Sequence, residues 1–112
     1  MKRIEAIIRP TKVSEVCAAL EKIGHPGVTI SEVEGHGSQK GLVTEVRGKK
    51  YKVELLTKTK VEVMVKDTDA DKIVKAIRDA ALTGEIGDGK IFVHDMNNVI
   101  RIRTGENGDE AI

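Results

Sequence analysis

One stretch of the chain occurs twice, and this repeat is the feature that most restricts the possible folds. Residues 3–24 align with residues 60–81 at an offset of 57 positions and without a gap, so that Glu5 meets Glu62 and Thr11 meets Thr68. The first part of each copy reads as a strand, and the second part carries apolar residues at the i, i+3, i+4, i+7 spacing of an amphipathic helix. Each copy therefore predicts a strand followed by a helix.

A further strand is expected after each helix, at residues 28–35 and 90–95, and Gly24 and Gly84 are expected to end the two helices. The element order is then βαβ–βαβ. The natural arrangement is an α+β, ferredoxin-like split βαβ–βαβ sandwich, with an antiparallel four-stranded sheet and both helices on one face. Since 112 residues suffice for one hydrophobic core, we expect a single domain, residues 1–112.

The sheet face that the helices leave open is expected to be partly apolar. In the first strand Ile4, Ala6 and Ile8 share one face, which leaves Ile7 on the other, together with Met64 and Phe92. A large exposed apolar patch usually marks an interface, so we expect an oligomer packed through its sheets. The alternative is a monomer with a partly apolar face.

Composition excludes several function classes. The net charge is +1 and only Tyr51 and Phe92 are aromatic, which disfavours a nucleic-acid-binding module. The sequence contains no apolar run of about 18 residues, so we expect no membrane insertion. The first residues do not resemble a signal peptide and there is a single cysteine, so a cytoplasmic protein is expected.

A long basic segment separates the two copies of the repeat. Residues 36–60 contain seven Lys or Arg and two Glu, a net charge of +5. About 17 residues, Ser38 to Glu54, separate the flanking strands, whereas a plain hairpin loop needs only about 2–5. A projecting basic arm favours docking or anion binding. The alternative is a solvated loop without a binding role.

Two further segments suggest phosphate binding. Residues 84–90 read G-E-I-G-D-G-K, which fits the G-x-x-x-x-G-K pattern, but Ile91 replaces the Ser or Thr of a P-loop and a strand follows instead of a helix. Arg101 and Arg103 are two residues apart, which would place both guanidiniums on one side of an extended segment. No arrangement of nucleophile and base is evident. A small ferredoxin-like enzyme acting on phosphorylated substrates remains the alternative function.

These features together resemble the PII signal-transduction proteins, which regulate nitrogen metabolism. The resemblance covers the whole chain and is carried by "AIIRP", "VTISEVEGHGSQKG", "RGKKY", "TGEIGDGKIFV" and "VIRIRTGE". It implies a non-catalytic regulator that forms a homotrimer and binds ATP or ADP in the clefts between subunits. It also implies a partner-binding T-loop at about residues 37–55, a glycine-rich turn at residues 82–90 and a C-terminal basic segment at residues 99–105.

The resemblance further implies the ligands of each cleft. The phosphates would be held by the glycine-rich turn of one subunit and by the two arginines, which come from its neighbour or from the adjoining C-terminal loop. ATP would carry Mg²⁺ and, through it, 2-oxoglutarate. The implied nucleotide-binding residues are Ile7, Thr29, Gly35, Gly37, Ser38, Gln39, Met64, Gly87, Asp88, Gly89, Lys90, Arg101 and Arg103. The implied 2-oxoglutarate-binding residues are Gln39, Lys40, Gly41, Leu56, Lys58 and Gly87, and Gln39 is the implied Mg²⁺ ligand.

The T-loop is implied to change its conformation with the bound ligands and so to control partner proteins. Arg47 matches the position that docks into an ammonium channel, and Tyr51 matches a position that some relatives modify. The partner stays open among an ammonium transporter, glutamine synthetase and a modifying enzyme. Ser38 stands where many relatives carry an arginine, so one cation is missing, and either the ATP affinity or the preference between ATP and ADP is expected to differ.

Overall fold

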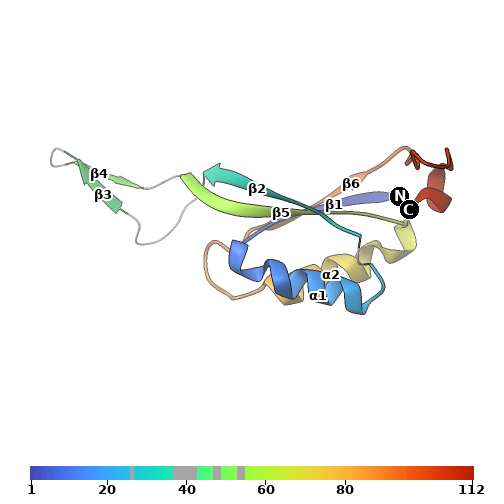
Figure 1. Ribbon diagram of the computed structural model, residues 1–112. Coiled ribbons are helices and arrows are strands. Elements are labelled where there is room, and N and C mark those ends of the chain that lie inside the picture. The colour runs from blue at the N-terminus through green and yellow to red at the C-terminus, as the bar shows by residue number, and fades with distance from the viewer. Residues whose placement is uncertain (26, 37–42, 47–48, 53–54) are drawn as a thin grey trace.

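Four antiparallel strands form the main sheet in the order β2–β5–β1–β6, and both α-helices cover one of its faces (Figure 1). The strands are β1 (Lys2–Ile8), β2 (Thr29–His36), β5 (Leu55–Val65) and β6 (Lys90–Asp95), and the helices are α1 (Val13–Lys22) and α2 (Ala70–Ala81). The described residues also form three 3₁₀ helices: η1 (Pro10–Lys12), η2 (Asp67–Asp69) and η3 (Gly108–Ala111). The ferredoxin-like α+β prediction is confirmed.

This computed structural model describes residues 1–25, 27–36, 43–46, 49–52 and 55–112, without the side chains of 36, 43–46, 49–52 and 55. In the described part no helix is long and apolar enough to cross a membrane.

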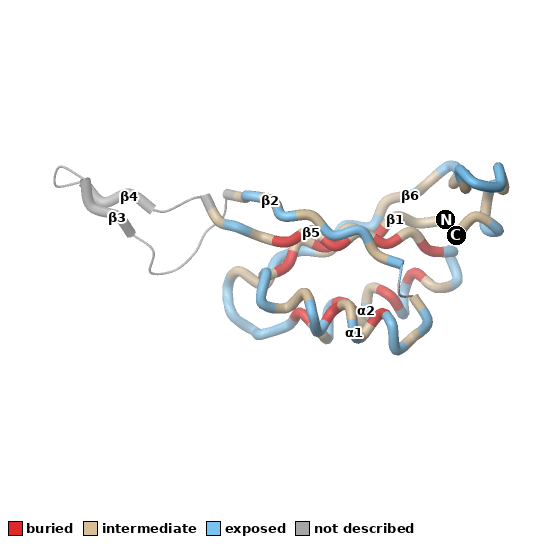
Figure 2. The backbone as a smooth tube through the Cα atoms, viewed as in Figure 1, coloured by how far each residue is buried: buried red, intermediate tan, exposed pale blue. Residues whose placement is uncertain are grey.

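The core lies between the sheet and the two helices, where Figure 2 shows the buried residues. Matching positions of the repeat are buried together, so the two copies meet across one core. The fully buried pairs are Ile4 with Val61, Val16 with Ile73, and Leu20 with Ile77. Full burial of one such side chain stabilises the fold by about 1.5–3 kcal/mol, so the repeated apolar pattern is the main source of stability.

The two predicted helix stops have different outcomes. Gly24 has a φ of 87° and follows Ile23, the C-cap of α1. Its N–H donates to the Glu21 carbonyl, and the His25 N–H donates to the Leu20 carbonyl. This is a Schellman motif, so the first stop is confirmed. The second is wrong, because α2 already ends at Ala81, and Leu82 after it has an extended backbone at φ −68° and ψ 126°. Gly84 instead belongs to the following turn.

The outer face of the sheet mixes apolar and charged side chains. Ile7 and Met64 are half-buried, and Phe92 is exposed in the single chain. Glu5 lies opposite both Glu62 and Phe92 on the neighbouring strands. Two carboxylates directly across a strand pair repel each other, so this face gains little stability by itself. Packing of the sheets in an oligomer stays a prediction.

The segment between the repeats contains two strands that the sequence analysis did not predict. β3 (Val43–Val46) pairs antiparallel with β4 (Lys49–Lys52) as a separate two-stranded sheet, in which Val43 lies opposite Lys52. The β-branched residues in "VTEV" were the available signal, since such residues favour strands.

Candidate functional site

The glycine-rich turn between α2 and β6 packs against the end of β1. Gly84, Gly87 and Gly89 have φ angles of 89°, 107° and 96°. A Cβ added at Gly89 would lie only 1.7 Å from the Ile7 carbonyl oxygen, which belongs to the backbone and cannot rotate away. Glycine is therefore required at position 89 both for its φ angle and for the close approach of two backbones.

The Asp88 carboxylate holds the turn together from inside. Its Oδ2 accepts hydrogen bonds from the backbone N–H groups of Thr83 and Gly84, each at 2.9 Å, and its Oδ1 accepts one from the Thr83 hydroxyl. Arg9 donates from Nε to the same Oδ1 at 3.1 Å. These donors, with the Thr83 hydroxyl first, hold the pKa of the Asp88 carboxyl far below its ordinary value. The Asp88 side chain is therefore ionised, and both of its oxygens already accept hydrogen bonds from the turn and from Arg9.

Two cations bind successive carbonyl oxygens of the turn. Arg9 Nη2 donates to the Ile86 carbonyl at 2.8 Å, and Lys58 Nζ donates to the Gly87 carbonyl at 2.6 Å. Partial burial, and after it the positive charge of Arg9, lowers the pKa of the Lys58 ammonium. Lys58 comes from β5 and Arg9 follows β1, so two strands of the sheet fix one short loop.

The carbonyl positions determine where the next N–H groups point. In a trans peptide the C=O of one residue and the N–H of the next point in opposite directions. The Gly87 N–H therefore points away from Arg9, and the Asp88 N–H points away from Lys58. Within the described residues, the N–H groups of Gly87 and Gly89 donate to no protein acceptor. The Asp88 N–H instead lies toward the Glu85 carbonyl, in the turn at residues 86–87. Free N–H groups in a turn with alternating φ can bind an anion.

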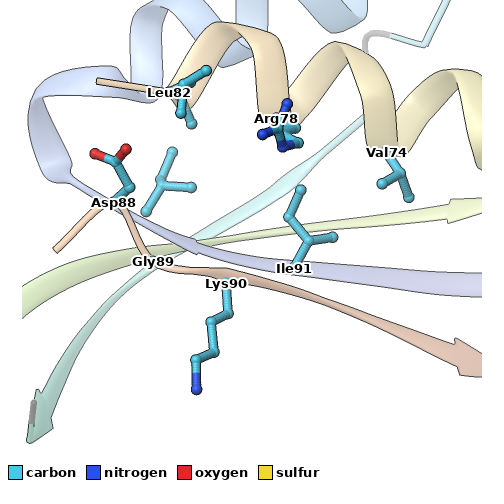
Figure 3. Close-up of a pocket in the computed structure, with 9 residues that line it drawn as sticks. Val74, Arg78, Leu82, Asp88, Gly89, Lys90 and Ile91 are labelled. Atoms are coloured by element: carbon cyan, nitrogen blue, oxygen red, sulfur yellow. The ribbon is translucent and has the colours of Figure 1, made fainter. Parts of the chain in front are cut away.

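The Lys90 side chain and the cavity beside the turn lie on opposite faces of the sheet. The cavity, of about 330 Å³, lies between α2 and β6 and is lined by Ile8, Val74, Arg78, Ala81, Leu82, Asp88, Gly89, Lys90 and Ile91. Figure 3 shows Ile91 pointing toward α2 and Lys90 pointing away from it. Lys90 lies opposite Ile7 in the register of β1 and β6. The Lys90 ammonium is thus placed toward the outer face of the sheet, where Ile7 lies.

The predicted binding residues form two groups at opposite ends of the outer face. The first group lies near the turn: Ile7 is opposite both Lys60 and Lys90, and Gly35 is opposite Leu56, two residues from Lys58. The second group lies toward the other end. Thr29 is opposite Glu62, and Met64 is opposite Arg3. The five residues from Lys60 to Met64 span about 13 Å of strand.

Arg101 and Arg103 belong to the distant end as well. They follow β6, whose six residues from Lys90 to Asp95 span about 17 Å. Figure 1 shows the C-terminal segment beyond the end of β6, on the side opposite to the glycine-rich turn. One chain therefore does not bring the two arginines to Gly87 and Lys90.

The prediction of an extended segment at the two arginines is wrong. The Gly105 N–H donates to the Arg101 carbonyl at 2.8 Å, and the Arg101 N–H donates to the Glu106 carbonyl at 2.8 Å, which closes a turn. The Arg101 guanidinium donates to the Glu106 carboxylate at 3.1 Å and to the Glu110 carbonyl at 3.2 Å. The Arg103 side chain is exposed. Because residues 101–104 do not form a strand, the side-chain alternation of a strand gives no reason to place the two guanidiniums on one side.

Several predicted residues fall outside the described part of the chain: Gly37, Ser38, Gln39, Lys40, Gly41 and Arg47. Tyr51 lies on β4 opposite Thr44. In the described ranges, no group of three or more His, Cys, Asp or Glu side chains lies close enough together to hold a metal ion.

Arg9 and Thr83 both bind Asp88, and neither role was predicted from the sequence. A signal for Arg9 was present, because the repeat predicts that the first strand lies in the middle of the sheet. The end of an antiparallel central strand lies beside the start of its neighbour. Arg9 directly follows such an end, so it was a candidate for contact with the residues just before β6.

Comparisons with known proteins agree on one family. A family model described as "Nitrogen regulatory protein P-II" matches residues 1–106. The chain is 54% identical over 112 residues to a nitrogen regulatory protein P-II of Rhizobium meliloti, with all of both chains covered. It is 51% identical to nitrogen regulatory protein P-II 2 of Methanothermobacter thermautotrophicus, covering all of this chain and 97% of the relative.

A solved structure gives the same result. A crystal structure of Arabidopsis thaliana PII bound to citrate superimposes with a TM-score of 0.82 at 41% sequence identity, and the match covers 99% of this chain and 91% of the other.

Proposed function

The chain belongs to the nitrogen regulatory protein P-II family, and on this premise we propose that it is a non-catalytic, cytoplasmic regulator that senses ATP, ADP and 2-oxoglutarate. Ligands bind in the clefts between subunits of a homotrimer. The T-loop, about residues 37–55, then docks on a nitrogen-metabolism protein such as an ammonium transporter or glutamine synthetase, with Arg47 at the docking surface and Tyr51 as a possible modification site.

The observation that carries the proposal is the hydrogen-bonded turn with its free N–H groups. Gly87 and Gly89 present backbone donors on a loop whose Ile86 and Gly87 carbonyls and Asp88 carboxylate are already bound by Arg9 and Lys58. Phosphate oxygens are strong acceptors, and Lys90 adds a positive charge from the first residue of β6. Ile7, on the outer face beside Lys90, offers an apolar surface for the adenine.

The separation of the two residue groups supports binding between subunits. Thr29, Met64, Arg101 and Arg103 lie too far along the sheet from Gly87 and Lys90 for one subunit to bring all of them to one nucleotide. A second copy can supply the distant group if the outer faces of the sheets pack against each other. Closed cyclic symmetry then gives every subunit one neighbour on each side.

We assign the effector site to the first residue group. 2-Oxoglutarate is a dianion, and its carboxylate would bind Lys58, with Leu56 and Gly87 beside it. The Arabidopsis relative bound to citrate, another carboxylate anion, supports this chemistry. Mg²⁺ would be held by Gln39 together with oxygens of ATP and 2-oxoglutarate, which are the hard ligands it prefers.

Isothermal titration calorimetry of the purified protein tests the proposal. ADP, ATP and ATP with Mg²⁺ should bind at micromolar to millimolar concentration, and 2-oxoglutarate should bind only when ATP and Mg²⁺ are present. Absence of nucleotide binding at millimolar concentration would refute the proposed function. Sustained hydrolysis of ATP that depends on Lys90 would instead favour an enzyme.

A variant separates the two ligands. Gln39→Ala should lose the 2-oxoglutarate effect while still binding ADP, because ADP binding does not need the metal. If the 2-oxoglutarate effect survives in this variant, the assignment of Gln39 as the Mg²⁺ ligand is wrong.

A further inference from the structure

We propose that Arg9 is a positioning residue that sets the phosphate-binding geometry of residues 86–89, acting through Asp88 and the Ile86 carbonyl; this inference rests on the proposed nucleotide-binding function. Arg9 itself is not a phosphate ligand in this scheme. Its guanidinium already donates to two acceptors of the turn, Asp88 Oδ1 at 3.1 Å and the Ile86 carbonyl at 2.8 Å.

The sequence holds Arg9 in the required conformation. Pro10 follows it, and a residue before proline is restricted to extended backbone. Arg9 accordingly has φ −62° and ψ 137° and marks the end of the strand before η1 begins. Its side chain is only 24% exposed, so the ion pair with Asp88 is partly shielded from water.

Arginine suits this position better than lysine. The two acceptors come from residues 86 and 88, and they are bound by two different nitrogens of one planar group, Nε and Nη2. A guanidinium offers such donors in a fixed arrangement, whereas an ammonium is a point charge on a flexible stem. A lysine at position 9 keeps the charge but cannot bind both acceptors with the same geometry.

Arg9 affects phosphate binding in two ways. First, it fixes the Ile86 carbonyl and so directs the Gly87 N–H to the opposite side. Second, it neutralises Asp88, whose carboxylate would otherwise stand uncompensated beside an incoming phosphate and repel it. The carboxylate is needed because it binds Thr83 and Gly84, and Arg9 makes its presence compatible with an anion site.

The experiment compares nucleotide binding by Arg9→Met, Arg9→Lys, Asp88→Asn and the double variant Arg9→Met/Asp88→Asn. Lys75→Met is the matched control, because Lys75 is an exposed cation on α2 that binds only Asp79 among the described residues. It removes the same charge far from the turn. Affinities for ADP, ATP and adenosine are measured by calorimetry or by competition, and folding is checked by circular dichroism and the unfolding midpoint.

Arg9→Met should weaken ADP and ATP binding by roughly tenfold or more, the effect of losing a hydrogen bond to a charged group. Adenosine binding should stay unchanged, because the defect concerns the phosphates. Arg9→Lys should lie between wild type and Arg9→Met. The double variant should bind ADP more tightly than Arg9→Met, since the neutral amide that replaces the Asp88 carboxylate no longer repels the phosphate; a purely structural role of Arg9 would not give this rescue.

The inference is overturned if wild type binds ADP and the ADP affinity of Arg9→Met equals that of Lys75→Met. It is also overturned if adenosine and ADP affinities fall equally and Asp88→Asn gives no rescue. Should Arg9→Met fail to fold, the comparison of Arg9→Lys with wild type decides, and equal ADP affinity refutes the proposal. A wild type that binds no nucleotide refutes the proposed function itself, which is a different result from any of these.

Discussion

Alanine at position 89 should destabilise the protein considerably more than alanine at position 84. Both glycines have nearly the same backbone conformation, with φ 96° at Gly89 and 89° at Gly84. Their surroundings differ: a Cβ at Gly84 meets nothing within 4 Å, whereas a Cβ at Gly89 lies 1.7 Å from the Ile7 carbonyl oxygen. The pair therefore separates the cost of the φ angle from the cost of the contact.

The expected losses of the free energy of unfolding follow from the cost of the positive φ angle and the cost of the contact with Ile7. A residue with a side chain in the left-handed region costs about 1–2 kcal/mol, and the smaller entropy of the unfolded chain offsets about 0.4–1 kcal/mol of it. Gly84→Ala should thus lose about 1 kcal/mol of the free energy of unfolding. At Gly89 the carbon and oxygen must separate by about 1.5 Å to reach an ordinary contact. Such overpacking adds about 1–3 kcal/mol, so Gly89→Ala should lose about 2–4 kcal/mol.

Urea unfolding followed by circular dichroism at one fixed subunit concentration measures both values, since stability depends on concentration in an oligomer. Gly89→Ala should also weaken ADP binding, because the turn or the end of β1 has to move. Equal loss of stability in the two variants, within about 0.5 kcal/mol, would show that the contact at Ile7 does not restrain the turn.

Further predictions concern the core, the turn carboxylate and the effector cation. Ile73→Ala should lose about 2–5 kcal/mol in urea unfolding, because the side chain is fully buried between the two copies of the repeat, and a loss below about 1 kcal/mol would contradict that placement. Asp88 has a lower pKa in the folded than in the unfolded chain, so its stabilisation is present above about pH 4 and is lost as the pH falls further and the unfolded chain takes up the proton. The free energy of unfolding should consequently fall more steeply between about pH 5 and pH 3 in wild type than in Asp88→Asn, and parallel curves would refute this. Lys58→Gln should abolish 2-oxoglutarate binding measured by calorimetry at saturating ATP and Mg²⁺, and it should also weaken ADP binding because Lys58 holds the Gly87 carbonyl of the turn. An unchanged 2-oxoglutarate affinity would exclude Lys58 from the effector site.

The fold could be predicted from the sequence because burial leaves a periodic pattern. Ile4 and Val61, or Leu20 and Ile77, occupy equivalent buried positions, and the repeat alone predicts this equivalence. The end of α2 at Ala81 was missed since a helix can end in extended backbone, here at Leu82, without a glycine. β3 and β4 were missed because their sequences, "VTEV" and "KKYK", show no strict alternation of apolar and polar residues.

The site was predictable in its residue types but not in its hydrogen bonds. The glycines and Lys90 indicated an anion site because close backbone approach and positive charge are general requirements. The roles of Arg9 and Thr83 depend on which segments lie side by side after folding, and no local pattern contains that information. The same reason explains the error at Arg101, whose binding to Glu106 and Glu110 closes a turn that strand alternation does not foresee.

The position of the glycine-rich turn and of the arginine pair at opposite ends of β6 has a genetic consequence. In the proposed trimer each cleft combines a turn from one subunit with arginines from the next. A chain defective at Lys90 lacks a working turn but keeps its arginine pair, and a chain defective at Arg103 lacks a working arginine pair but keeps its turn. In a closed ring that contains both kinds of chain, an intact turn always meets an intact arginine pair at one junction. Co-expression of two inactive alleles should therefore restore part of the nucleotide binding that neither allele has alone.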